Sequence, residues 1–344
     1  EDSVSEKLAN ALALELTGEQ KERMAKHYTG NTEAYQLYGK GVFLRSQMTQ
    51  DALQKSIECF RRAIQLDPNY ALAYAGQASS ISPMAAIGFM PLREAESTNR
   101  ALINKALELD NELPEAHAAL AEFKFFMEWE WDGAEKEFKR ALELNPHEPQ
   151  SLLLYPDVLL IKGRPEEAVA FSKTAFDLDP LSARTGKALA HTYYFAGKYD
   201  QALEQSRKVL ELFPNYHLIS LGPVYEQKGM YDEAIEGYLQ TEKRSGLPEA
   251  SVTSLRNAYA KSGWQGYWSQ RLALIKTEKQ SVSPVFVASL YARLGDKDKA
   301  IEYLQRAYDL RDMLLMFIKV DPVWTSLHSD PRFTALLQRL RLNS

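Results

Sequence analysis

The chain has 344 residues, of which 45% are hydrophobic and 25% are charged, and these ordinary values exclude a largely disordered chain. Its formal net charge of −5 argues against nucleic acid as the main partner of this segment, because phosphate binding requires a basic surface. The one cysteine, Cys59, excludes an internal disulfide and a zinc site built from cysteines, and no apolar run is long enough to span a bilayer.

The first predicted element is an amphipathic helix over residues 3–16, in which Val4, Leu8 and Leu16 recur at helical spacing. We assign residues 1–31 to an N-terminal helical junction segment. The sequence opens EDSVSE, without Met and without the basic-then-apolar pattern of a signal peptide. This opening indicates a fragment of a longer protein, with a processed mature N-terminus as the alternative.

A regular pattern of apolar, Ala-containing helices follows, and many of these helices end at a proline. Pro146, Pro180 and Pro214 are 34 residues apart. A fixed period of this length indicates a solenoid of helix pairs, not a compact enzyme domain. The sequence therefore predicts an array of about eight units over residues 32–312. Residues 313–344 are predicted to form a capping segment that covers the apolar face of the last unit, as terminal repeats require.

The best-preserved unit runs from about residue 181 to 214 and shows how one helix pair is specified. Small residues, Ala190 and Ala202, are placed where the two helices cross closely, and Gly197 can adopt the positive φ that ends the first helix. The order Ala190, Tyr193, Gly197, Tyr199, Ala202 resembles the tetratricopeptide repeat. The resemblance implies an all-α, right-handed superhelical solenoid that acts as a non-catalytic protein–protein interaction scaffold.

Both ends of the array resemble a more specific bacterial family. Residues 5–38 (SEKLANALALELTGEQKERMAKHYTGNTEAYQLY) and 319–333 (KVDPVWTSLHSDPRF) are similar to regulators in which a TolB-like domain precedes a tetratricopeptide array. In that family the upstream effector is a winged-helix domain, a serine/threonine kinase or a nucleotide cyclase. The resemblance implies the sensing or interaction region of a larger bacterial regulatory protein, either in the cytoplasm or on the extracytoplasmic face of the inner membrane.

The sequence carries no recognisable catalytic motif. The six histidines are scattered, and no Gly-x-Ser-x-Gly elbow, P-loop or Gly-x-Gly-x-x-Gly fingerprint is present. Cys59 lies on an apolar helix face, which favours a buried structural thiol over a nucleophile. We therefore expect no enzymatic activity, no cofactor and no metal site.

Binding is expected in the concave groove, which first-helix residues line in the tetratricopeptide family. Arg184, Lys187 and His191 would form one basic strip, which suits a peptide carboxylate or an acidic side chain. The Lys/Asn/Lys/Arg clamp of chaperone-binding members is not matched, because His191 stands where Asn is needed. The same mapping adds these groove residues: Tyr194, Asp157, Glu122, Asn257, Glu115 and Gln150.

Two classes of function remain open at this point. The first is capture of a protein or peptide segment in the groove, for which the simpler alternative is that these side chains are only exposed helix residues. The second is self-association, in which the array forms a homodimer and thereby brings two upstream effector domains together.

Overall fold

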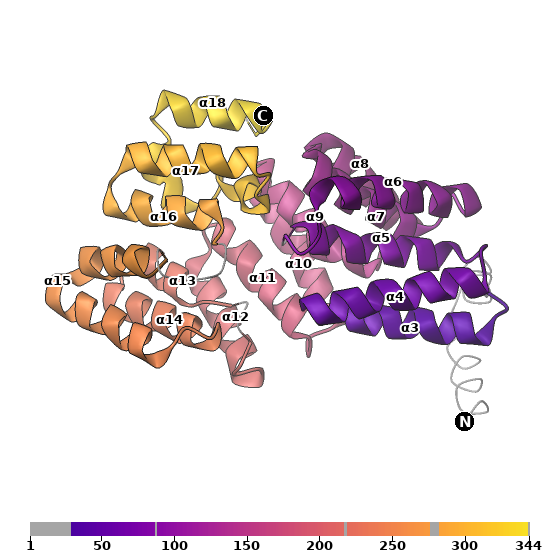
Figure 1. Cartoon of the computed structure of the whole chain (residues 1–344), viewed down its shortest axis with the longest axis horizontal. Helices are drawn as coiled ribbons and strands as arrows, with labels where there is room; N and C mark the ends of the chain where they lie inside the picture. Colours follow the sequence, from indigo (N-terminus) through magenta and orange to yellow (C-terminus); the bar gives the residue numbers. More distant parts are fainter. Residues whose placement is uncertain (1–28, 87, 217–218, 276–281, 343–344) are drawn as a thin grey trace.

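The computed structural model describes residues 29–342, except 87, 217–218 and 276–281. The amphipathic helix predicted over residues 3–16 lies outside these described residues, as does most of the junction segment 1–31. Within the described part every regular element is a helix and none is a strand, and the helices form consecutive antiparallel pairs (Figure 1). The prediction of an all-α repeat solenoid is confirmed.

Eight helix pairs can be followed through the described part of the chain. The first five are α3 (Thr32–Ser46) with α4 (Gln50–Leu66), α5 (Ala71–Ala86) with α6 (Leu92–Leu109), α7 (Pro114–Phe123) with α8 (Trp131–Leu144), α9 (Pro149–Ile161) with α10 (Pro165–Leu178), and α11 (Ala183–Phe195) with α12 (Tyr199–Leu212). The sixth pair is α13 (Gly222–Gln227) with α14 (Tyr231–Arg244), the seventh lies within α15 (Glu249–Ile275), and the eighth is α16 (Pro284–Leu294) with α17 (Lys297–Asp309).

Each pair is held by large apolar residues of one helix against small residues of its neighbours. Phe60 of α4 is fully buried, and its ring lies against Gly41 of α3 and Gly76 of α5. A Cβ atom built on Gly76 would stand 2.6 Å from the Phe60 ring, so only glycine allows this close approach without a shift. The same logic explains why small residues recur at the helix crossings of the sequence pattern.

The sixth and seventh pairs depart from the regular geometry. The first helix of the sixth pair, α13, has only six residues. In the seventh pair the two helices are continuous across a kink at Ser262 and Gly263, where Gly263 adopts a φ of 60°. Trp268 follows this kink and is buried. The seventh pair thus accommodates a large side chain where its backbone departs from the regular helix pair.

The end of the chain consists of three short helices, η2 (Met313–Phe317), η3 (Pro322–Leu327) and α18 (Pro331–Arg339). The last of these, α18, contacts α17, and η3 contacts α16. These elements also return to the middle of the array, where one buried apolar cluster joins residues between 121 and 168 to residues between 285 and 342. In Figure 1 the yellow C-terminal elements lie beside the purple and magenta middle helices.

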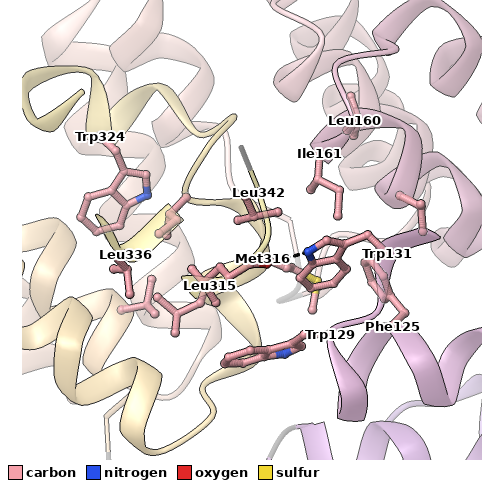
Figure 2. Close-up of a cluster of buried hydrophobic side chains, with 14 of the residues drawn as sticks. Phe125, Trp129, Trp131, Leu160, Ile161, Leu315, Met316, Trp324, Leu336 and Leu342 are labelled. Carbon is pink, nitrogen blue, oxygen red and sulfur yellow. Dashed lines mark hydrogen bonds between the residues drawn. The ribbon is translucent and has the colours of Figure 1, made fainter. Parts of the chain in front are cut away.

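Trp131, the first residue of α8, is central to this return contact. Its Nε1 donates a hydrogen bond to the carbonyl oxygen of Leu340 at 2.7 Å, across 209 residues of sequence. Figure 2 shows Trp131 and Phe125 on one side of the cluster and Met316 and Leu342 on the other. The C-terminal segment therefore does more than the predicted cap, because it closes the array onto its own third and fourth units.

Candidate ligand-binding surface

The first helices of successive units contact one another directly and form the inner layer of the array. The contacts run from α3 to α5, from α5 to α7, from α7 to α9 and from α9 to α11. Side chains that point away from the paired second helices therefore gather on one surface, which we call the concave surface. Of the cavities on it, two are lined by residues of α11.

The larger one, the N-terminal cavity, has a volume of about 700 Å³ and lies between the end of α3 and the beginnings of α9 and α11. Its apolar wall includes Val42 and Met48 from the first unit and Leu152, Leu153 and Leu178 from the fourth. Its polar wall includes Arg45, Glu115, Glu148, Gln150 and Arg184.

Two arginines from different units face this cavity. Arg184 of α11 is half-buried, and its Nη2 donates a hydrogen bond to Oε1 of Gln150 at 3.0 Å. Burial lowers the pKa of Arg184 to about 10, and the positive charge of Arg45 contributes to the lowering. Neither arginine forms an ion pair with any residue that the structure describes. A guanidinium carries five N–H donors, and of the ten in this pair the described residues engage the one that Arg184 donates to Gln150.

Three carboxyl groups lie near the two arginines, and burial raises the pKa of each of them. Glu148 is buried and caps α9, accepting hydrogen bonds from the backbone N–H groups of Gln150 and Ser151. Burial raises the pKa of Glu115 and of Glu122 to about 7. Glu122 Oε1 accepts a hydrogen bond from the Ser79 hydroxyl at 3.1 Å, but Glu122 Oε2 and Glu115 Oε2 have no partner in the described part of the chain.

The smaller one, the distal cavity, has a volume of about 250 Å³ and includes Lys187, His191 and Tyr194 of α11. Here the returning C-terminal segment occupies the concave surface. The ring of Phe317 stacks on that of Phe195, with 5.0 Å between centroids, and meets the His191 ring edge-on. The Tyr194 hydroxyl donates a hydrogen bond to Asp321 Oδ1 at 3.3 Å.

The predicted groove residues are thus divided among separate environments. Arg184 lies at the N-terminal cavity, whereas Lys187, His191 and Tyr194 lie at the distal cavity. Asp157 pairs with His191, with 3.6 Å between Oδ1 and Nδ1. Glu122 is completely buried, and Asn257 is exposed on α15. The single basic strip predicted from the sequence is therefore shared between two cavities.

Arg45 was not among the predicted groove residues. It comes from α3, whose sequence follows the repeat pattern less regularly than the fifth unit does. The signal that identifies it is its spacing from Tyr38: the two residues are seven positions apart, so both lie on one helix face, and both line the cavity.

Two further features of the described residues concern metal binding and membrane insertion. Among the described residues, no group of three or more His, Cys, Asp or Glu side chains is arranged to hold a metal ion. Within the same residues, none of the helices combines the length and apolar character needed to cross a membrane.

Comparison with protein families identifies repeats along the array. One tetratricopeptide-repeat model matches residues 45–70 and 285–312, and a second model of the same repeat matches residues 130–183 and 187–250. Together these matches cover half of the chain and fall in both its N-terminal and C-terminal parts.

Two curated proteins are similar at lower identity. Superkiller protein 3 of Schizosaccharomyces pombe is 25% identical over 218 residues, which are 59% of this chain and 14% of that protein. Transcriptional regulator HilA of Salmonella typhimurium is 26% identical over 192 residues, which are 56% of this chain and 34% of that protein. The chain thus spans only about a third or less of the length of these relatives.

Among solved structures, the human IFIT1 dimer with PPP-AAAA superimposes with a TM-score of 0.51 at 17% identity. The match covers 76% of this chain and 70% of that chain. At this identity the likeness shows a shared fold alone.

Proposed function

We propose that this chain, which belongs to the tetratricopeptide-repeat proteins, is a non-catalytic scaffold that binds a segment of a partner protein on its concave surface. It serves as the sensing or interaction region of a larger bacterial regulatory protein. The observation that carries this proposal is the N-terminal cavity, in which Arg45 and Arg184 have no ion-pair partner among the described residues. The similarity to HilA supports the regulatory part.

The chemistry of the cavity favours a segment that combines an acidic group with apolar side chains. A carboxylate can accept paired hydrogen bonds from a guanidinium, and such charge-assisted bonds are stronger than neutral ones. The apolar residues Leu152 and Leu153 lie in the same cavity and can bury the side chains next to that carboxylate. An extended segment lying across α9 and α11 would meet both.

The test is a binding screen with peptides that place one Asp or Glu among apolar residues, followed by anisotropy titrations of the hits. The Arg184→Ala/Lys187→Ala double variant should bind at least about ten-fold more weakly, because a hydrogen bond to a charged group is lost. The exposed Arg61→Ala variant is the matched control. Equal affinity of the wild-type chain and the double variant would remove this groove assignment. The two single variants then separate the N-terminal cavity (Arg184) from the distal one (Lys187).

A second candidate function is self-association, which would bring two upstream effector domains together. The supporting observation lies on α3 of the first unit, where Tyr35 and Phe43 are each 65% exposed. Light scattering across a concentration series decides this alternative. A dimer that is lost in the Tyr35→Ser/Phe43→Ser variant supports it, and a monomer at the highest concentration excludes it.

A further inference from the structure

The N-terminal cavity is lined by arginine and glutamate side chains that form no ion pair with any described residue, together with an apolar wall. We propose that this cavity binds a short peptide with free ends, whose carboxylate lies on Arg45 and Arg184 and whose ammonium group lies on Glu115. The inference rests on the concave surface of the proposed function, but its ligand is a small zwitterion and not a segment of a protein chain. An experiment can therefore contradict dipeptide binding without contradicting the capture of a protein segment, and the reverse.

The anionic end of such a ligand is specified by the two arginines. They come from α3 and α11, which are far apart in sequence, yet both line one cavity and the charge of Arg45 lowers the pKa of Arg184. Within the described residues, the Arg184 side chain donates its hydrogen bond to a neutral amide oxygen, that of Gln150. The carboxyl groups of Glu122 and Glu148 also act on Arg184, but no described acidic side chain forms an ion pair with either arginine. Both guanidinium groups therefore keep N–H donors for the carboxylate of a ligand.

The cationic end is specified by Glu115. Its carboxyl group lines the same cavity and receives no hydrogen bond from the side chain of any described residue. Its neighbour Glu148 differs, because backbone N–H groups of α9 bond to both oxygens of that carboxylate, whereas Glu115 Oε2 has no partner among the described residues. Glu115 is thus the lining carboxylate that gains most from an ammonium partner, since an unpaired carboxylate in a partly buried site is costly.

The cavity that these charged groups line also has an apolar wall, and its size is suitable. Val42, Leu152 and Leu178 lie on the wall of a cavity of about 700 Å³, within the range typical of small-ligand sites. A dipeptide with two leucine side chains supplies the matching apolar surface. Because the cavity joins α3 of the first unit to α11 of the fifth, a bound peptide would cross-link two distant units of the array.

The protonation of Glu115 provides an independent readout. The charged or titratable groups that face it are Tyr38 and Arg45 of α3, Asp110 after α6, and Glu148 before α9. Burial raises the pKa of Glu115 to about 7, so at pH 6.5 a large part of this group is protonated. An ammonium group favours the ionised form, and its binding should release protons to the buffer.

The experiment is isothermal titration calorimetry of the full 344-residue chain with Leu-Leu, N-acetyl-Leu-Leu and Leu-Leu-amide. Leu-Leu should bind, and removal of either end charge should weaken binding at least about ten-fold. N-acetyl-Leu-Leu stands for the C-terminus of a protein, which offers the carboxylate without the ammonium. Titrations at pH 6.5 in buffers of different ionisation enthalpy should detect proton release for Leu-Leu and for whatever Leu-Leu-amide binds, because both carry the ammonium group, but none for N-acetyl-Leu-Leu.

Variants assign each end of the ligand to its residue. Arg184→Gln should abolish the preference for Leu-Leu over its amide, and Glu115→Gln should abolish the preference over the N-acetyl form together with the proton release. Arg61→Gln and Glu143→Gln, at exposed ion pairs, are the matched controls and should bind as the wild type does. Thermal melts verify that every variant is folded.

Two results would overturn the inference. No saturable binding of Leu-Leu removes the site, and equal binding of Leu-Leu and N-acetyl-Leu-Leu removes the ammonium contact with Glu115. In the second case the proposed capture of a protein segment still stands, because the carboxylate contact is retained. Conversely, failure of every longer peptide in the screen above leaves the dipeptide result intact.

Discussion

The N-terminal and distal cavities lie on the same inner layer of helices but differ in what surrounds their charged groups. In the distal region, Arg293 of α16 forms a bidentate ion pair with Glu226 of α13, and Asp321 accepts a hydrogen bond from Tyr194. In the N-terminal cavity, Arg45 and Glu115 form no ion pair within the described residues. The C-terminal segment supplies Asp321 to the distal region, but none of its described residues lines the N-terminal cavity, which supports that cavity as the proposed ligand site.

The largest expected effect concerns the contact that closes the array. Trp131→Ala removes a 5% exposed indole from the cluster in Figure 2 and the hydrogen bond to Leu340. We expect a loss of about 3–5 kcal/mol in the free energy of unfolding, measured by urea denaturation. The exposed Phe43→Ala control should change it by less than about 0.5 kcal/mol. A small effect for Trp131→Ala would mean that the closure contributes little to stability.

The ion pair of the distal region should give the next largest effect. Arg293→Ala leaves the carboxylate of Glu226 buried without its partner, and the side chains of the pair are only 11% and 12% exposed. The expected loss is about 3 kcal/mol, because an uncompensated buried charge is costly. Urea denaturation provides the measurement, with the exposed Arg140→Ala variant as control. If the N-terminal cavity is independent of this region, peptide binding by the folded variant should be unchanged.

For a buried carboxyl group near the N-terminal cavity we expect the opposite effect: replacing it by a neutral amide should increase the free energy of unfolding. The pKa of Glu122 is raised to about 7, so the folded state retains its proton more strongly than the unfolded state does. Stability from this group is fully present below about pH 4.5 and is lost as the pH rises through about 7. Glu122→Gln should therefore match the wild type near pH 4.5 and be more stable by about 2–3 kcal/mol at pH 8.

Denaturation of the Glu122→Gln variant at several pH values tests this sign directly. The exposed Glu143→Gln variant should follow the wild-type chain across the same range. A Glu122→Gln variant that is less stable than the wild type at pH 8 would show that the ionised carboxylate is stabilised in the folded protein, contrary to the comparison above.

The smallest effect is expected at Asn257. Its side chain is exposed on α15, outside both cavities. Asn257→Ala should change the free energy of unfolding by less than about 0.5 kcal/mol and leave peptide binding unaltered. A clear loss of binding, measured by the same anisotropy titrations, would extend the binding surface beyond the N-terminal cavity.

The repeat architecture was predictable from the sequence because its signals are local. Glycines such as Gly197 end first helices, and the prolines after second helices recur at a fixed period, so each unit is specified by residues close to it in the chain. Arg184 was likewise placed on the inner surface by its position within a repeat. Local spacing gives the face of the helix on which a residue lies, and Arg184 lines the N-terminal cavity.

The division of the groove was not predictable by the same means. It depends on Phe317 and Asp321 returning to α11, and no periodic pattern connects residues so far apart in sequence. Local spacing also does not predict that Arg45 and Arg184 line one cavity, because they come from the first and the fifth unit and meet only through the path of the units between them. Repeat position therefore predicts which residues face inward, but not what they meet there.

The hydrogen bond between Trp131 and Leu340 also has a consequence for synthesis on the ribosome. The middle units emerge before the 209 residues that separate the two partners have been added. At a typical rate of about 5–20 residues per second, the indole and its apolar neighbours remain uncovered for about 10–40 s. During this interval the nascent chain exposes apolar side chains that are buried in the folded protein. We therefore expect the need for chaperone binding to be greatest at this stage.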